Sequence, residues 1–214
     1  MTTSASRTTN ESPTTPRKRT AEQVLLSASD ASWAGIAADD LDATLCDHAH
    51  CEKKASASAI ALINAYPGDE PLVRAMSALA IEEMEHFAEI YQLLQTRGVT
   101  LKRDQGDPYV KALLAHVRQP SDQRKMDRLL ISALIEARSC ERFKLLKEEL
   151  FARGDEENAV RFRRLESSEA GHAVLFIKLA RDEFGEAETN ARLAELAQAE
   201  AEIVAKLPIV PRIH

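Results

Sequence analysis

The sequence contains few residues that interrupt helices and no apolar run of membrane-spanning length. Glycine and proline number only 7 and 8 among 214 residues, whereas alanine, leucine, glutamate and arginine dominate. Such a composition is typical of helical proteins. No apolar run approaches the roughly 20 residues that span a bilayer, and the first residues contain no apolar signal segment. We therefore expect an all-α, cytoplasmic protein without a membrane partner.

Cysteine and net positive charge are also scarce. The three cysteines, Cys46, Cys51 and Cys140, cannot all pair within one chain, and they lack the C-x-x-C spacing of zinc or rubredoxin-type iron sites. A reducing cytoplasm fits them best, and we expect Cys51 and Cys140 to be small packing residues. The formal net charge is −6, so the chain lacks the overall basic character of many nucleic-acid-binding proteins.

Composition divides the chain into a tail and one domain. Residues 1–20 are rich in threonine, serine, proline and arginine and contain almost no apolar side chains. Because they cannot bury enough surface to offset the entropy of ordering, we predict a disordered tail over 1–20 and one folded domain over 21–214.

Apolar periodicity and helix-capping residues predict the elements of the domain. We expect a short helix within 21–37 and long helices over about 39–66, 70–97, 121–153 and from 155 onward. A long connection over 99–120 contains a short helix. A further amphipathic helix over 186–206 packs outside the bundle, and residues 208–214 form a short extended tail.

A repeated pattern of glutamate and histidine lies on the apolar faces of the four long helices. The chain reads E-x30-E-x2-H, then 49 residues, then E-x32-E-x2-H. One E-x-x-H pair alone is usually a solvated ion pair, but two such pairs with this spacing predict a four-helix bundle that holds two metal ions. The six candidate ligands are Glu52, Glu83, His86, Glu136, Glu169 and His172.

The charge of these six side chains favours a metal site. Four carboxylates give −4, which two divalent ions cancel when the histidines are neutral. Without metal, carboxylates in an apolar stripe would each cost several kcal/mol or take up protons. Mixed Glu and His ligands suit iron or manganese, and ligand identity does not decide between them. Each Glu of an E-x-x-H pair either ligates the same ion as its histidine or bridges both ions.

Some neighbouring residues allow two interpretations. His48, one turn before Glu52, either supports the site or is an ordinary helix histidine, whereas Glu82 and Glu85 fall off the apolar stripe and are expected at the surface. Three charged residues around the third-helix ligand could orient ligands from outside or form a surface ion-pair network: Arg138, Glu141 and Arg142.

Four short sequence motifs resemble the tRNA 2-methylthio-isopentenyl-adenosine hydroxylase family. They are DHAHCEKKA at 47–55, LIEARSCERF at 134–143, SEAGH at 168–172 and RGV at 97–99. LIEARSCERF resembles the most characteristic motif of that family, and the resemblance covers about residues 40–214. The chain departs from the pattern at 80–87, where it reads AIEEMEHF and the family has something closer to AREELHHF. The E-x-x-H spacing is kept there.

The resemblance implies a ferritin-like four-helix bundle with one long crossover, flanking helices and diiron monooxygenase activity. It implies hydroxylation of the isopentenyl side chain of a modified adenosine next to the tRNA anticodon. O2 would be the co-substrate, and electrons would come from an external electron-transfer partner. The six residues of the repeated pattern match the iron ligands of the family, which holds two iron ions.

A tRNA substrate would require a local basic surface, because phosphate contacts supply much of the affinity for nucleic acid. The extruded base would enter a pocket from a single-stranded loop. The cluster at 161–164 is the densest group of cations and is equally consistent with a solvated helix face. The candidate phosphate contacts are Lys53, Lys54, Lys102, Arg103, Arg161, Arg163 and Arg164.

Two other functions are compatible with the same metal pattern. A ferritin-like oxidase or oxygenase that acts on a small or lipid-like molecule would suit the acidic net charge. An iron-handling or peroxide-detoxifying protein would bind more than about two iron ions per chain if it stored them.

Overall fold

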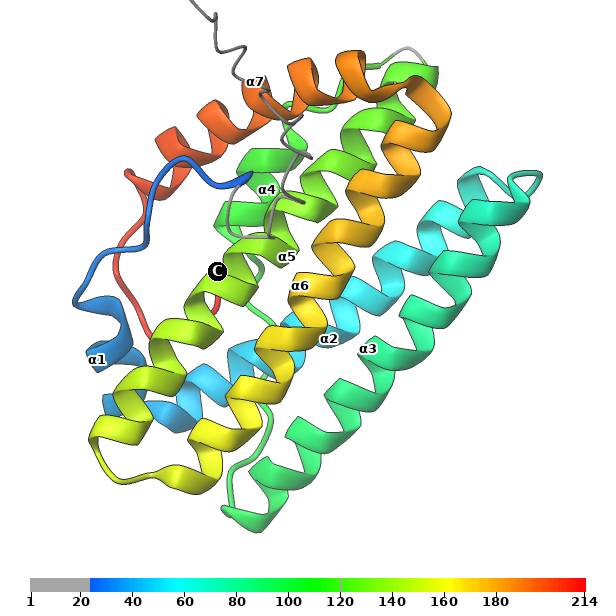
Figure 1. The fold of residues 1–214 in the computed structure, drawn as a ribbon. Coiled ribbons are helices and arrows are strands. Elements are labelled where there is room, and N and C mark those ends of the chain that lie inside the picture. Colours follow the sequence, from blue (N-terminus) through cyan, green and yellow to red (C-terminus); the bar gives the residue numbers. More distant parts are fainter. Residues whose placement is uncertain (1–23, 120) are drawn as a thin grey trace, which may run out of the picture.

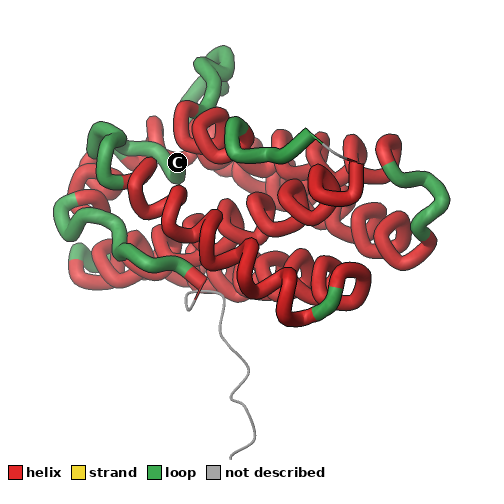
Figure 2. The backbone as a smooth tube through the Cα atoms, turned by 90° about the horizontal axis from the view of Figure 1, so that it is seen from above, coloured by secondary structure: helices red, strands yellow, loops and turns green. Residues whose placement is uncertain are grey.

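A computed structural model describes residues 24–119 and 121–214. Within these ranges the chain is helical and contains no strand (Figure 2). The predicted tail over 1–20 lies outside the described residues. The helices, labelled in Figure 1, are α1 (Trp33–Asp39), α2 (Leu41–Ala65), α3 (Glu70–Thr96), α4 (Pro108–Leu114), α5 (Ser121–Ala152), α6 (Glu156–Phe184) and α7 (Glu186–Val204).

Aspartate side chains fix the starts of four of these helices. Asp40, Asp69, Asp107 and Asp155 each accept a hydrogen bond from the backbone amide three residues further on. This satisfies one amide that has no partner inside the helix. At the other end of α3, Gly98 has a φ of 70°, a left-handed conformation that favours glycine. These signals explain why the predicted bounds of α2, α3 and α6 agree with the structure to within a few residues.

The four long helices form a bundle of two antiparallel pairs (Figure 1). Helix α2 packs against α3, and α5 packs against α6. The connection after α3 carries α4 and returns the chain to the end of the bundle where α3 begins. The ion pair between Lys125 Nζ on α5 and Asp69 Oδ2 at the start of α3, 2.6 Å long, marks that shared end. This long crossover confirms the predicted ferritin-like topology.

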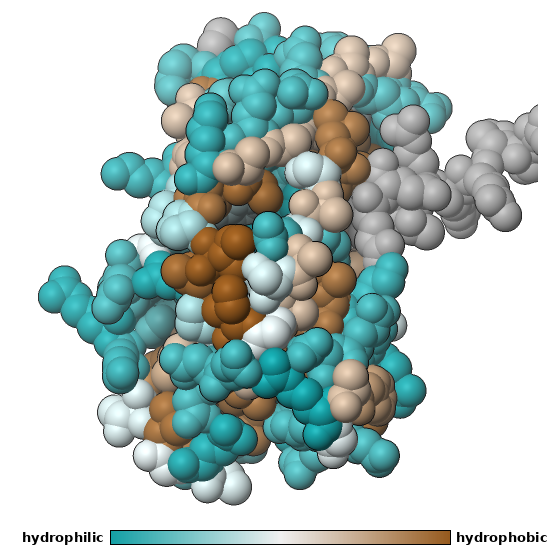
Figure 3. Space-filling view, turned by 90° about the vertical axis from the view of Figure 1, so that its left-hand side faces the viewer, coloured by the Kyte–Doolittle hydropathy of each residue, from teal (hydrophilic) through white to brown (hydrophobic). Residues whose placement is uncertain are grey.

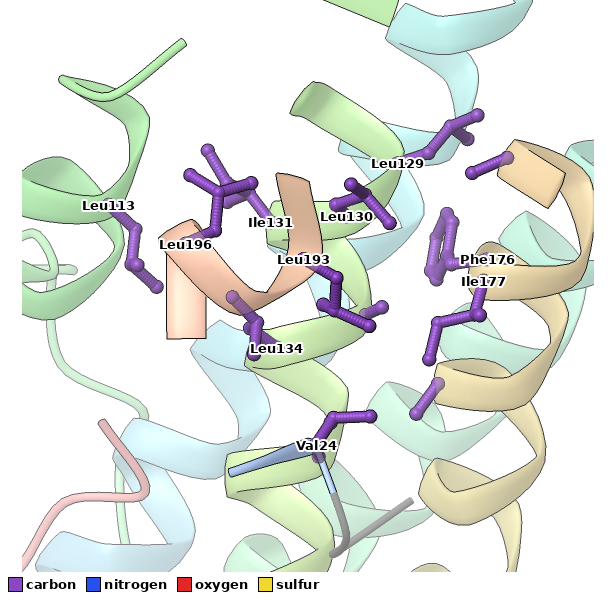
Figure 4. Packing of buried hydrophobic residues seen from close by; sticks show 14 of the residues in the cluster. Val24, Leu113, Leu129, Leu130, Ile131, Leu134, Phe176, Ile177, Leu193 and Leu196 are labelled. Atoms are coloured by element: carbon purple, nitrogen blue, oxygen red, sulfur yellow. The ribbon is translucent and has the colours of Figure 1, made fainter. Parts of the chain in front are cut away.

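The buried apolar residues form two clusters, one toward each half of the bundle. The first contains Leu72, Leu129 and Phe176 together with Leu193 and other residues from α7, and Figure 4 shows part of its packing. The second contains residues nearer the other ends of the four long helices: Leu45, Ile90, Leu94, Phe143, Leu146 and Phe162. On α2, α3 and α6 the residues between the two clusters include the predicted metal ligands, whereas Glu136 on α5 lies among residues of the first cluster.

The first helix differs from the prediction, because the helix expected within 21–37 begins only at Trp33 and ends at Asp39. The last segment, 208–214, is non-helical as predicted, and it packs onto the protein, with Ile213 fully buried and His214 only 9% exposed. We call residues 208–214 the C-terminal strap.

Hydrogen bonds to the strap backbone help to hold it in place. Trp33 Nε1 donates to the carbonyl of Arg212 at 2.9 Å, and the amide of Ile213 donates to Asp47 Oδ2 at 2.8 Å. The Arg142 guanidinium donates to the carbonyl of Ile213 at 2.7 Å.

Helix α7 lies across one end of the bundle, outside the four long helices, and packs on α4, α5 and α6 (Figure 1).

On the face seen in Figure 3, hydrophobic side chains gather in the middle and are bordered by hydrophilic ones. Across the described part of the chain, no helix is both long and apolar enough to cross a membrane.

Candidate metal centre

All four long helices place carboxylate or imidazole side chains at the same level of the bundle interior. Helix α2 carries Glu52 and α5 carries Glu136, and both are at most 6% exposed. Helix α3 contributes an E-x-x-H pair and α6 a second one, because residues three apart lie on the same side of a helix. The members of these pairs are Glu83, His86, Glu169 and His172.

The six side chains fall into two overlapping groups, each able to surround one metal ion. One group is Glu52, Glu83, His86 and Glu169, and the other is Glu83, Glu136, Glu169 and His172. Within each group the nearest possible ligand atoms all lie within 4.8 Å of one another. Glu83 and Glu169 belong to both groups. This sharing favours the interpretation in which the Glu of each E-x-x-H pair lies between the two positions.

Several donor atoms of these groups lie close together without a hydrogen-bond partner. His172 Nδ1 is 3.0 Å from Glu83 Oε1 and 3.4 Å from Glu169 Oε2, and His86 Nδ1 is 3.6 Å from Glu52 Oε2. Both Glu83 oxygens and the Nδ1 atoms of both histidines are buried without a hydrogen-bond partner. Buried polar atoms are normally paired. A set of lone-pair atoms that converge without partners fits a pair of cations.

Burial and mutual repulsion change the pKa values of the site. Burial raises the pKa of Glu136 well above its usual value, and the charge of Glu169 raises it further. Burial likewise raises the pKa of Glu169. Burial lowers the pKa of the two histidines, but the neighbouring carboxylates outweigh it and raise His86 to about 10 and His172 to about 9. Without metal, protons therefore neutralise part of the charge that two cations would balance.

Two further side chains contact the candidate ligands. His48 is fully buried on α2, lies against Phe143 and contacts a carboxylate oxygen of Glu52. The structure thus places it beside the site. Glu82 was expected at the surface, and its side chain is indeed 48% exposed, yet its Oε2 lies 3.4 Å from His172 Nε2. No pattern in the local sequence predicts this contact, because it depends on how α3 faces α6.

The charged residues near Glu136 form neither a set of ligand-orienting groups nor a surface network. Arg138 is fully buried and pairs with Glu200 of α7 at 2.9 Å, and its guanidinium also contacts Glu141. Tyr109 donates a hydrogen bond to Glu200 at 3.0 Å. The network connects α5, α4 and α7, so its role is to hold the flanking helices.

A cavity of about 100 Å³ lies beside the candidate ligands. Four carboxylates of the site line one side of it, and Val110, Ile135, Phe143 and Ile213 provide apolar walls. Typical small-molecule pockets measure roughly 300–1,000 Å³, so this cavity suits a small aliphatic group better than a whole nucleoside. Polar lining is contributed by Cys51, Lys54, Ser132, Ser139, Asp107 and His214.

The basic residues suggested as phosphate contacts are partly engaged by acidic neighbours. Arg161 Nε lies 3.6 Å from Glu89 Oε1, and Arg164 pairs with the same carboxylate. Lys54 lies 3.7 Å from Asp104 and 3.8 Å from Asp107. Arg163 is exposed.

Four long helices whose Glu and His side chains converge at mid-length define the ferritin-like class of carboxylate proteins. Comparison with known sequences gives the family. The chain belongs to the family described as tRNA-(MS[2]IO[6]A)-hydroxylase (MiaE), whose sequence profile matches residues 17–214. This membership identifies it as an oxidoreductase of the hydroxylase type.

Individual relatives agree with this membership. A tRNA 2-(methylsulfanyl)-N(6)-isopentenyladenosine(37) hydroxylase of Pseudomonas putida is 38% identical over 141 residues, which cover 66% of this chain and 67% of that protein. A protein of the same name from Salmonella typhimurium is 34% identical over 106 residues, which cover 50% of this chain and 38% of that protein.

One solved structure has a similar fold. It is described as protein 43 with aldehyde deformylating oxygenase activity from Synechococcus. The TM-score is 0.78, the sequences are 33% identical, and the match covers 89% of this chain and 94% of that one.

Proposed function

We propose that the protein is a diiron monooxygenase that hydroxylates the isopentenyl side chain of 2-methylthio-isopentenyl-adenosine next to the tRNA anticodon. The observation that carries the proposal is the pair of overlapping ligand groups, which share Glu83 and Glu169 inside a bundle of this family. The proposed ligands are the six residues of the repeated pattern. Their oxygen and nitrogen donors suit iron.

The donor set leaves room for a reaction. Six side chains do not fill the coordination of two ions, so positions remain for O2 and water. Two bound iron ions would supply the oxidising power that hydroxylation of an unactivated C–H bond requires. The carboxylate-lined side of the cavity faces the site, and the apolar walls hold the alkyl group against it and exclude water.

The size of the cavity limits which part of the substrate can enter it. The isopentenyl group enters the cavity, and the adenine base stays at the mouth after extrusion from the anticodon loop. Phosphates contact cations on the protein surface, among which exposed Arg163 remains a candidate. Electrons come from an external donor, and the reaction takes place in the cytoplasm.

Nucleoside mass spectrometry of tRNA tests the proposal. The protein is expressed in a host that makes the methylthio-isopentenyl base but has no hydroxylase of its own. We expect a nucleoside that is one oxygen atom heavier, and we expect Glu136→Ala to abolish it. Glu85→Ala is the matched control, because Glu85 is exposed on α3 and belongs to neither ligand group. The absence of the new nucleoside, with iron-loaded protein and a working electron donor, would overturn the proposal.

The similarity to the Synechococcus protein favours one alternative, an oxygenase that acts on a small aliphatic aldehyde. The same cavity would then hold the chain of the aldehyde. Incubation of the iron-loaded protein with an aliphatic aldehyde, O2 and a reductant would release formate if this alternative is correct. Formate release without tRNA hydroxylation would replace the first proposal.

A further inference from the structure

Three polar side chains from distant parts of the chain meet at the wall of the cavity. Ser139 Oγ on α5 lies 2.9 Å from Nε2 of His214 in the strap. The other ring nitrogen, Nδ1, lies 3.4 Å from Oδ2 of Asp107, which precedes α4. The His214 ring also stacks on Tyr109, with 5.1 Å between ring centroids, and this contact fixes its plane. The arrangement is a continuous chain from carboxylate through imidazole to hydroxyl.

This chain leads from solvent to the candidate metal ligands. At the outer end, Lys54 has a side chain that is 35% exposed and lies 3.8 Å from Asp107. At the inner end, Ser139 follows Glu136 by three residues, so both side chains leave α5 on the same side, and both line the cavity. Ser139 and His214 are themselves buried, at 5% and 9% exposure.

The proposed reaction requires protons inside this cavity. Conversion of a C–H bond to C–OH by O2 consumes two protons and two electrons and releases one water molecule, with the electrons supplied by an external two-electron reductant. We propose that Asp107, His214 and Ser139 form a proton relay from solvent to the cavity, an inference that rests on the proposed function.

Each transfer moves one proton along the relay. When the His214 ring carries a second proton, Ser139 gives its hydroxyl proton to the cavity and takes the proton on Nε2. Nε2 regains its proton from solvent when the product leaves the cavity, and the second proton of the turnover enters with that solvent. Asp107 orients the ring and offsets the positive charge that develops on it.

Charge states at the outer end of the relay suit this role. Burial raises the pKa of Asp107, but the contact with His214 outweighs burial and holds it at about 2, so the carboxylate is ionised at neutral pH. Cys51 Sγ lies 3.6 Å from Nδ1 of His214.

The side chain of His214 is not needed to hold the strap in place. The bonds from Trp33, Asp47 and Arg142 attach to the backbone of residues 212 and 213. Replacement of the His214 or Ser139 side chain therefore leaves these three attachments in place.

The first test uses the full chain without metal and measures the relay directly. In 15N spectra of labelled histidine, we expect Ser139→Ala to shift the Nε2 signal of His214 and Asp107→Asn to shift the Nδ1 signal. Ser132→Ala is the matched control, because Ser132 lines the same cavity but is not a member of the relay. If neither relay variant moves the His214 signals, the chain of contacts does not exist and the proposal is overturned.

The second test uses the iron-loaded protein with tRNA, O2 and reductant. We expect Ser139→Ala to slow hydroxylation on the order of a hundredfold, to release hydrogen peroxide in place of product, and to keep its iron. Ser139→Thr should restore the amount of product formed per reductant consumed, because threonine keeps the hydroxyl. Free imidazole should restore part of the hydroxylation rate of His214→Ala. A structural role for these side chains would explain neither recovery. If Ser139→Ala forms as much product per reductant consumed as the unsubstituted protein, the relay is overturned and the hydroxylase function stands. Lack of product from the unsubstituted protein would overturn both.

Discussion

Glu82 approaches His172 from outside the candidate metal centre, with Glu82 Oε2 3.4 Å from Nε2. The opposite nitrogen, Nδ1, faces Glu83 at 3.0 Å. The 3.4 Å contact is an ion-pair contact and not a hydrogen bond, yet a carboxylate near the outer nitrogen favours a proton there, so that the inner nitrogen keeps its lone pair for an ion.

Replacement of Glu82 should therefore weaken metal binding without removal of a ligand. We expect Glu82→Gln to lower iron affinity by about 10- to 100-fold, the usual effect of losing such an outer partner. Iron titration of the metal-free protein measures this change. Glu85→Gln, an exposed position on the same helix, should leave the affinity unchanged. Equal effects of the two variants would show that Glu82 acts only through surface charge.

The sharing of two carboxylates predicts different iron contents for different ligand variants. Glu136 belongs to one ligand group, whereas Glu169 belongs to both. Glu136→Ala should retain about one iron ion per chain, and Glu169→Ala should retain almost none, since a dinuclear site of this kind is built around its bridging positions. Metal analysis, with circular dichroism to confirm the helical fold, distinguishes them. Identical iron contents would contradict the assignment of Glu169 as shared.

Histidine protonation predicts opposite effects of pH on the metal-free protein and on metal binding. The pKa values of about 10 for His86 and about 9 for His172 exceed the value of about 6.5 expected in the unfolded chain. The resulting stability is fully present below pH 6.5 and is lost as pH rises through 9 and 10. The Tm of the metal-free protein should fall over this interval, and a rise would contradict the prediction.

Metal binding must displace these same protons. Calorimetric titration with ferrous iron at pH 7, under anaerobic conditions and in two buffers with different ionisation enthalpies, should show proton release. His172→Ala should reduce the number of protons released. An unchanged number would show that this imidazole does not exchange its proton for a metal ion.

The buried pair between Arg138 and Glu200 predicts a loss of stability that is separate from metal binding. Both side chains are fully buried. Glu200→Ala leaves buried Arg138 with Glu141 as its remaining acidic partner and should cost about 3 kcal/mol in the free energy of unfolding, the low end of the range for a broken buried ion pair. Iron content should remain unchanged if the folded protein is measured, because the network joins α5 to α7 and not to the ligand groups. Loss of iron in the folded variant would indicate a direct link to the site.

Much of the bundle could be predicted from local sequence. Asp69 and Gly98 mark the ends of α3 through bonds and dihedral angles set by residues close in the chain. The helical period placed the six ligand candidates on apolar faces of the helices. The nearly equal spacing of the candidates in the two halves of the chain placed them at one level of the bundle. The structure brings them together as that pattern requires.

Contacts between distant segments could not be predicted. Arg138 meets Glu200, 62 residues later, and Ser139 meets His214, 75 residues later. No periodicity links such pairs, because they depend on where α7 and the strap come to rest. Glu82 lies at the surface as predicted, but its contact with His172 could not be predicted for the same reason, since exposure of a side chain does not prevent its tip from reaching a neighbouring helix.

The division of the core into two apolar clusters has a consequence for how the protein opens. Helical bundles usually fray from their ends, where packing is thinnest. Here each end has its own packed cluster, and between the clusters α2, α3 and α6 carry carboxylates that repel one another, which raises the pKa of Glu169. The metal-free protein should therefore exchange its amide hydrogens fastest in the middle of the long helices. Bound iron would slow this exchange, because it would hold the carboxylates of different helices together.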